Sequence, residues 1–320
     1  MILLLFIGLS MAFNYSAPIT IDNGIQSTTY PVAYDQKNDL ILFGNGKTMY
    51  IYDLTGKLVN QFNVVNEITS MDITTYDTIL VLTTPDNVIF DYDYSGTLIK
   101  TTFFGGFNGG STQVLCHQKL KNFYVWYSAS SFYVVYSFNE NHQVISHAFI
   151  DKDVTGWHDF NIGELTGNLM YSTYQTIQIY NSTLNIVMNV TLDTIDPYPH
   201  TIVTETTNSI ATYFNYNSFT QYFIPDGTNI STVNTHNYLS SNVVYWYDQN
   251  YYITIWIKSK NNKDIPYIVF FSSDGNIVNT MDFCNDGISA YYNMYVYINQ
   301  ETGTIVANIN SEIKIWKLNK

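Results

Sequence analysis

A short turn signal recurs along the chain at nearly even spacing, and apolar runs flank each copy. A glycine preceded by Asp, Ser or Thr between two such runs is typical of a β-hairpin turn. The clearest copies are Tyr52–Val59, Tyr92–Ile99, Ile224–Ile230 and Phe270–Val278, with degraded copies at Asn139–His142 and Asn181–Leu184. A hairpin signal every 40 to 50 residues or so indicates one small antiparallel sheet per repeat.

The runs between the turns have the composition of β-strands. They are four to eight residues long and rich in Val, Ile, Tyr, Phe and Thr. Several, such as Phe123–Tyr127 and Tyr251–Ile257, are apolar on both faces. A sheet packed between two other sheets buries both faces, so this pattern favours stacked sheets. No stretch beyond the N-terminus shows sustained helical periodicity, and we expect an all-β fold.

Grouping the strands in fours divides the chain into six full units and a seventh of three strands. The units are about 28–62, 68–103, 112–149, 157–192, 199–235, 240–283 and 288–318. The run Pro18–Asp22 stands alone before the first unit. An incomplete sheet would leave an open edge, so we expect residues 18–22 to pair there as the fourth strand. The sequence thus predicts a seven-bladed β-propeller of four-stranded antiparallel blades, in one domain over residues 17–320.

The charge balance argues against two classes of partner. The net charge is −13, and all thirteen basic residues are Lys. Nucleic acids and anionic membranes attract clustered Lys and Arg, and no such cluster occurs here. We therefore expect neither a nucleic-acid partner nor adsorption to an anionic membrane. No run after residue 13 has the length of a membrane-spanning helix.

Residues 1–12 have the pattern of a secretory signal peptide. They are apolar, too short to span a bilayer, and end in Ser10-Met11-Ala12, a small-x-small cleavage pattern. The alternative is a buried N-terminal strand. Asn-x-Ser/Thr sequons agree with a secreted protein or one in the lumen of the secretory pathway. The sequon at Asn14 lies beside the signal peptide, and the expected glycosylation sites are Asn181, Asn189 and Asn229.

The two cysteines are expected to be free and buried. Cys116 falls in the third unit, and Cys284 follows the sixth. A disulfide needs Cα atoms within about 7 Å of each other. Residues in non-adjacent units do not meet this condition.

The repeat pattern resembles the broad WD40, NHL and YVTN-like group of seven-bladed propellers. Ile313–Lys317 looks like the last strand of a WD40 repeat, and the turns at Asp53 and Asp93 look like NHL turns. The Gly-His and Trp-Asp signatures of WD40 repeats do not recur. The resemblance implies that the loops joining one blade to the next surround one mouth of the ring and carry function.

Those loops contain the candidate site residues. Carboxylate and amide oxygens suit a hard cation such as calcium, and histidine can act as a general base near neutral pH. Aromatic residues in loops can stack on sugars or on partner side chains. The metal candidates are Glu67, Asn108, Asp153, Asp196 and Asp286, the catalytic candidates are His158 and His200, and the partner-binding candidates are Trp157 and Tyr198.

Loop residues of these types also simply cap turns, and no short metal-binding or catalytic motif occurs. The favoured hypothesis is therefore a secreted scaffold that binds a protein or glycan partner through this loop face. The alternative is a divalent-cation-dependent enzyme resembling lactonase-, hydrolase- or lyase-type propellers, and a third is a self-assembling coat or matrix protein.

Overall fold

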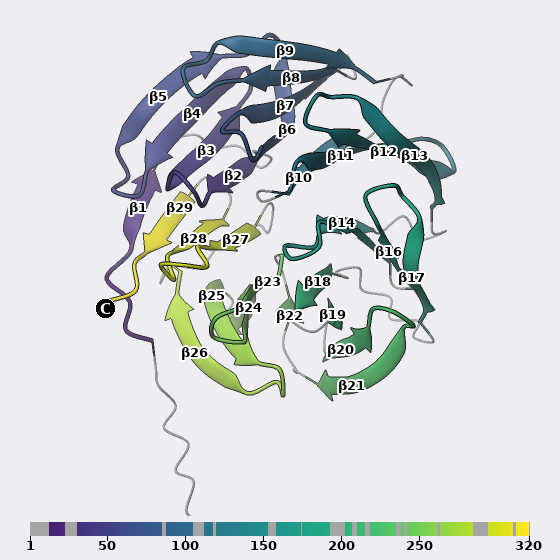
Figure 1. Ribbon diagram of the computed structural model, residues 1–320. Coiled ribbons are helices and arrows are strands. Elements are labelled where there is room, and N and C mark those ends of the chain that lie inside the picture. The colour runs from purple at the N-terminus through teal and green to yellow at the C-terminus, as the bar shows by residue number, and fades with distance from the viewer. Residues whose placement is uncertain are drawn as a thin grey trace, which may run out of the picture.

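The computed structural model describes most of the chain and leaves out several connections. The described residues are 13–22, 31–84, 88–104, 112–117, 120–152, 158–173, 175–192, 202–206, 210–214, 218–234, 238–239, 242–260, 263–283, 294–309 and 312–319. They form seven antiparallel sheets that surround a common axis like the blades of a propeller (Figure 1). Among them, no helix has the length and apolarity to cross a membrane.

Blades 1 to 3 each consist of four consecutive strands in simple order. Blade 1 contains β2 (Val32–Asp35), β3 (Leu40–Asn45), β4 (Thr48–Asp53) and β5 (Leu58–Asn63). Blade 2 contains β6 (Glu67–Ile73), β7 (Ile79–Thr84), β8 (Val88–Tyr92) and β9 (Leu98–Phe103). Blade 3 contains β10 (Thr112–Cys116), β11 (Asn122–Ser128), β12 (Phe132–Asn139) and β13 (Val144–Asp151).

Blades 4 and 5 repeat this plan, and blade 6 modifies it. Blade 4 contains β14 (Asp159–Ile162), β15 (Leu169–Ser172), β16 (Thr176–Tyr180) and β17 (Ile186–Thr191). Blade 5 contains β18 (Ile202–Thr206), β19 (Ile210–Phe214), β20 (Ser218–Phe223) and β21 (Thr228–Asn234). In blade 6 two short inner strands, β22 (Tyr238–Leu239) and β23 (Val244–Trp246), both pair with β24 (Tyr251–Lys260), which is followed by β25 (Lys263–Ser272) and β26 (Ile277–Asp282).

The last blade joins the two ends of the chain. It contains β27 (Met294–Ile298), β28 (Ile305–Ile309) and β29 (Glu312–Trp316), and its outer strand is β1 (Ile19–Asp22). β1 runs antiparallel to β29, with Ile19 opposite Ile315 and Asp22 opposite Glu312. The expected all-β propeller, with an N-terminal strand completing the last blade, is confirmed.

The core lies between the blades. Six clusters of buried apolar side chains each join two neighbouring blades, for example Leu42, Met71 and Val81 between blades 1 and 2, and a seventh consists of residues of blade 6. The middle strands are therefore apolar on both faces; the central residues of β11, Phe123–Tyr127, are all buried. The outer strands β5 and β9 have a neighbouring strand on one edge only, and most of their residues are exposed.

The repeated turn has the same hydrogen bonds in successive blades. Asp53 Oδ1 accepts the N–H groups of Thr55 (2.8 Å) and Lys57 (3.1 Å), which closes the turn between β4 and β5. Asp93, Asn139 and Asn181 cap the corresponding turns of blades 2 to 4 in the same way, whereas Asp226 in blade 5 accepts the N–H of Thr228. Short polar side chains that bond to the backbone two residues on favour such turns.

Each of these hairpins then enters the outer strand through a β-bulge. The register shifts by one residue at this point in blades 1 to 6. The bulged residues are Val59, Ile99, Ile145, Val187, Ile230 and Val278. A bulge disrupts the ladder and twists the strand, which protects an open sheet edge against pairing with another chain.

Candidate functional site

Antiparallel strands place the connections of every blade on two opposite faces of the ring. The turn face contains the turns between the first and second and between the third and fourth strands. The crossover face contains the turns between the second and third strands and the connections from one blade to the next. The site residues expected from the sequence belong to these blade-to-blade connections, and hence to the crossover face.

Few of those residues fall in the described part of the chain. Glu67 is exposed at the first residue of β6, on the crossover face. The candidates outside the described residues are Asn108, Asp153, Trp157, Asp196, Tyr198, His200 and Asp286. Within the described ranges, no group of three or more His, Cys, Asp or Glu side chains is placed to hold a metal ion. A cation site in the blade-to-blade connections stays a prediction.

His158 is part of an aromatic cluster between blades 3 and 4. Its Nδ1 atom lies 2.5 Å from the hydroxyl of Tyr133, and its ring centroid lies 5.2 Å from that of Trp126. Trp126 in turn stacks on Phe160 with a centroid distance of 4.7 Å. Tyr133 and Trp126 are buried. These contacts give His158 a packing role, which sequence reasoning did not anticipate.

The described cysteine agrees with the expected environment. Cys116 is free and buried at the end of β10. Burial, followed by the negative charges of Asp72 and Asp91, raises the pKa of the thiol well above its usual value. The thiol is therefore held in its unreactive protonated form. Cys284 lies outside the described residues.

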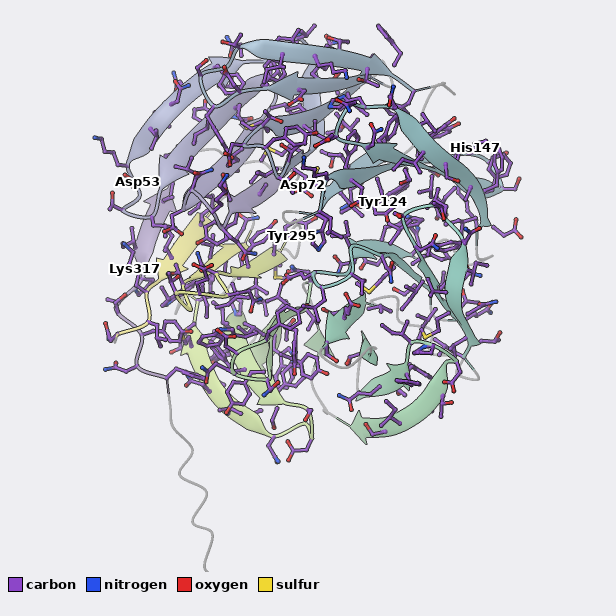
Figure 2. The ribbon with its side chains drawn as sticks, in the orientation of Figure 1. Asp53, Asp72, Tyr124, His147, Tyr295 and Lys317 are labelled. Atoms are coloured by element: carbon purple, nitrogen blue, oxygen red, sulfur yellow. The ribbon has the colours of Figure 1, made fainter. Side chains whose placement is uncertain are left out.

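Two carboxyl groups on innermost strands lie near the ring axis. Asp72 on β6 and Asp159 on β14 are surrounded by protein, and burial raises the pKa of each from 3.8 to about 7. Tyr295 projects from β27 in the same central region as Asp72 (Figure 2). Burial raises the pKa of Tyr295, and the charge of Asp159 raises it further. Both carboxyl groups can therefore exchange a proton near neutral pH.

The Asp72 carboxylate also covers an exposed sheet edge. Its Oδ2 atom accepts the N–H of Cys116 at 2.7 Å, and the hydroxyl of Ser70 accepts the N–H of Val114 at 3.1 Å. Both donors belong to β10, the innermost strand of the next blade. An inner edge strand has no neighbour on the axial side, so these side chains replace a missing strand for its N–H groups.

The same arrangement recurs farther round the ring. Asn242 bonds to both backbone groups of Val296, with Nδ2 to the carbonyl oxygen at 2.9 Å and Oδ1 to the N–H at 2.7 Å. The hydroxyl of Tyr297 donates to the carbonyl oxygen of Val32 at 2.8 Å. Polar residues near the axis thus serve as inter-blade links. No expectation from the sequence included Asp72 or Tyr297; the available signal was a charged residue inside the otherwise apolar run of β6.

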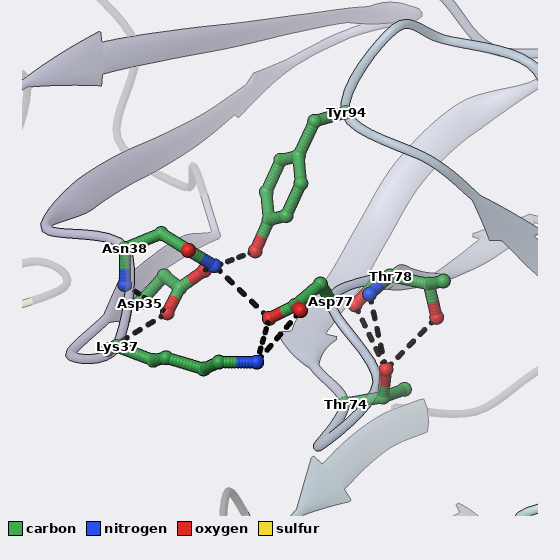
Figure 3. A network of polar contacts seen from close by, with 7 residues as sticks. All are labelled: Asp35, Lys37, Asn38, Thr74, Asp77, Thr78 and Tyr94. Atoms are coloured by element: carbon green, nitrogen blue, oxygen red, sulfur yellow. Dashed lines mark hydrogen bonds and ion pairs between the residues drawn. The ribbon is translucent and has the colours of Figure 1, made fainter.

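The turn face is fastened by polar contacts between neighbouring blades. In Figure 3, Lys37 of blade 1 forms an ion pair with Asp77 of blade 2, with Nζ 2.7 Å from Oδ2, and the Tyr94 hydroxyl donates to Asp35. Contacts at the other junctions are Tyr76 Oη to Glu140 O, Tyr124 Oη to Gly167 O, Thr166 Oγ1 to Glu205 Oε2, Tyr247 Oη to Glu205 O, Trp246 Nε1 to Gln300 O and Asn299 Nδ2 to Gln36 O.

In these contacts, polar groups of the turn face that could otherwise bind a ligand are bonded to the neighbouring blade. The buried carboxylate of Glu205, for example, accepts the N–H of Leu165 at 3.2 Å and the N–H of Thr166 at 3.1 Å. Burial raises the pKa of Glu205, and the bonds from Thr166 and Leu165 partly offset this rise. The described polar groups of the turn face therefore have mainly a structural role.

The outer strands expose aliphatic side chains at their turn-face ends, such as Ile99 and Val144, and in blades 2 and 3 they expose aromatic side chains toward their crossover ends. Phe103, the last residue of β9, is 80% exposed, and Phe149, near the end of β13, is 63% exposed. Val65, in the connection between blades 1 and 2, is 54% exposed. His147 lies beside Phe149, with ring centroids 5.8 Å apart. We call Val65, Phe103, His147 and Phe149 the apolar rim of blades 1 to 3.

The expected glycosylation sites lie on other blades. Asn181 is in the turn before β17, Asn189 is on β17, and Asn229 is on β21, so all three belong to blades 4 and 5. The side chains of Asn189 and Asn229 are exposed. In Figure 1, blade 5 lies across the ring from blades 1 and 2, and blade 4 lies next to blade 3.

Comparison with known proteins identifies the architecture. No protein-family model matches the chain, and no curated protein matches it in sequence. A similar solved structure is Raptor from Chaetomium thermophilum, with a TM-score of 0.71 and 11% sequence identity. The match covers 96% of this chain but 30% of the Raptor chain, and at this identity it shows the fold alone. The chain therefore has the β-propeller fold.

Proposed function

We propose that this chain is a secreted β-propeller that binds another protein through its crossover face and the apolar rim of blades 1 to 3. The observation that carries the proposal is the exposure of Phe103 and Phe149, of which 80% and 63% of the surface remain accessible. Aromatic residues dominate the binding energy of many protein interfaces, whereas scattered aliphatic residues on a surface need no explanation.

The distribution of polar groups supports the choice of face. On the turn face, the carboxylate of Asp35 accepts the hydroxyl of Tyr94 in the next blade, and that of Glu205 accepts the N–H of Thr166 in the preceding blade. The same contacts hold the blades in fixed relative positions, and a rigid scaffold suits a binding surface made of loops. The three expected glycans would project from blades 4 and 5 and not from blades 1 to 3, which carry the apolar rim. Proteins with this fold commonly bind proteins, an argument by analogy at the level of fold.

The first experiment looks for the partner. The chain is produced with its residues 1–12 in a secreting eukaryotic host, with a photo-crosslinking amino acid at position 103 or, in a matched control, at position 99. Ile99 is on the same strand and is 55% exposed, but it lies at the turn-face end of β9. We expect one extracellular protein to be crosslinked from position 103 and not from position 99.

The second experiment measures binding to that purified protein. Burying a Phe side chain is worth about 1.5–3 kcal/mol, so Phe103→Ser or Phe149→Ser should weaken binding by a factor of about ten or more. The matched variants Ile99→Ser and Val144→Ser should bind within about twofold of the unmodified protein. If all four variants bind alike, or if only the control position crosslinks, the proposed surface is wrong.

Secretion is tested separately. We expect the secreted product to begin at Phe13 and to lose mass when treated with an N-glycosidase. Retention of the protein inside the host with residues 1–12 intact would contradict secretion without bearing on the binding surface.

A further inference from the structure

We propose that residues 13–16 form a clasp that locks blade 6 to blade 7, and that closure of the ring depends on this clasp as well as on β1. The clasp, Phe13-Asn14-Tyr15-Ser16, precedes β1 and belongs to no sheet. This inference does not depend on secretion or on the apolar rim.

The backbone of the clasp extends the pairing of the chain ends beyond β1 and β29. The N–H of Ser16 donates to the carbonyl oxygen of Lys317 at 2.9 Å, and the N–H of Asn319 donates to the carbonyl oxygen of Asn14 at 2.8 Å. Between these bonds, Tyr15 forms an isolated antiparallel bridge with Leu318. The clasp is thereby tied to blade 7.

The side chains of the clasp face the other blade. The ring centroid of Phe13 lies 5.2 Å from that of Trp246, 5.6 Å from that of Tyr251 and 5.5 Å from that of Phe270. These three residues come from β23, β24 and β25, which are consecutive strands of blade 6. Phe13 and Tyr15 also pack against the buried apolar cluster between blades 6 and 7.

Further bonds attach the clasp to both blades. The Tyr15 hydroxyl donates to the carbonyl oxygen of Gly303, in the first turn of blade 7, at 3.1 Å. Asn279 of β26, in blade 6, donates to the carbonyl oxygen of Phe13 at 3.4 Å. The four residues thus contact blades 6 and 7 at once, whereas β1 pairs with β29 and packs against blade 1 through Ile19 and Ile21.

Closure of the ring depends on a non-covalent contact. The chain connects blades 1 to 7 in order, including blade 6 to blade 7, whereas β29 and the N-terminal strand that completes blade 7 are held together without a covalent link. Opening would begin where β1 leaves β29, and aromatic contacts of Phe13 with blade 6 oppose that step. Removal of the clasp, for example by a protease that cuts the chain before β1, would then loosen the ring while every sheet kept its full number of strands.

The test compares chains that differ only before β1. One begins at Phe13 and another at Ala17, so both retain β1 and all blades. We expect the shorter chain to melt about 5 °C or more below the longer one, and the amides of β29 to exchange hydrogen at least tenfold faster.

Point variants keep the test decisive if the shorter chain does not fold. Phe13→Ala should reproduce most of the loss, and Tyr15→Phe, which removes the bond to Gly303, should produce a smaller one. Phe103→Ala is the matched control, because this residue is exposed and should leave the melting temperature unchanged. Equal melting temperatures and equal exchange in β29 for the two chains and for Phe13→Ala would overturn the proposal.

Discussion

The Asp72 carboxyl should make the stability of the ring depend on pH in a defined direction. Burial raises its pKa from 3.8 to about 7, although the N–H groups of Cys116 and Ile73 favour the charged form. Well below pH 3.8 the group is protonated in both the folded and the unfolded state. As the pH rises from 4 to 7, the unfolded chain releases the proton and the folded chain keeps it. Stability that is present in acid is therefore lost as the pH rises through 7.

The size of the effect follows from the same values. A pKa difference between 3.8 and about 7 is worth at most ~4 kcal/mol, because each pKa unit corresponds to about 1.4 kcal/mol. About two-thirds of this, or 2–3 kcal/mol, falls between pH 5 and pH 8. For a domain of this size, that change shifts the melting temperature by about 5–10 °C.

Asp72→Asn isolates this contribution. An amide does not titrate, but its nitrogen cannot accept the N–H that one carboxylate oxygen accepts, so the variant should be less stable than the natural chain at pH 5. By pH 8 the difference should shrink or reverse. Thermal melts at four pH values between 5 and 8 measure it. Asp53→Asn is the control, because its exposed carboxyl has a lowered pKa. Parallel pH profiles for Asp72→Asn and the natural chain would refute the reasoning.

Two further predictions concern backbone positions that the packing restricts. Gly96 has φ +90°, and a Cβ atom there would lie 2.6 Å from Cγ of Phe62, so Gly96→Ala should lower the free energy of unfolding by about 2 kcal/mol or more. The matched variant Gly46→Ala, at φ +55° with open space around the Cβ position, should lower it by about 1 kcal/mol. Unfolding in denaturant measures both. Glu205→Ala leaves the N–H groups of Leu165 and Thr166 without their acceptor and should lower the free energy of unfolding by about 2–3 kcal/mol. Glu205→Gln keeps an acceptor oxygen and should lower it less. Equal losses for the two variants would contradict the role of Glu205 as the acceptor of these bonds.

Most of the fold could be predicted because its signals are local. The turn at Asp53 is closed by bonds to residues two and four positions away, so the residues that form it are adjacent in the sequence. The pairing of β1 with β29 followed from counting strands, because one strand stood alone before the first unit and the last unit lacked one. The split inner strand of blade 6 was not predicted, because a two-residue strand such as β22 has no periodicity to detect.

The site was less predictable because its properties arise between blades. Asp72 and Cys116 are 44 positions apart, and the bond between them exists because consecutive inner strands lie side by side at the axis. His158 was expected in a loop at the mouth of the central channel. It packs on Trp126 and Tyr133 instead, because the start of β14 is in contact with blade 3.

The sequence by itself determined the order of the strands, the position of each hairpin and the strand that completes the last blade, since short-range hydrogen bonding and apolar runs encode these features. Only the tertiary structure decided which polar groups are used between blades and which aromatic side chains stay exposed. Phe123 and Phe103 are both phenylalanines in predicted strands, yet one is buried and the other is 80% exposed. The physical reason is that burial depends on whether a neighbouring blade covers a residue, and that is a property of the closed ring.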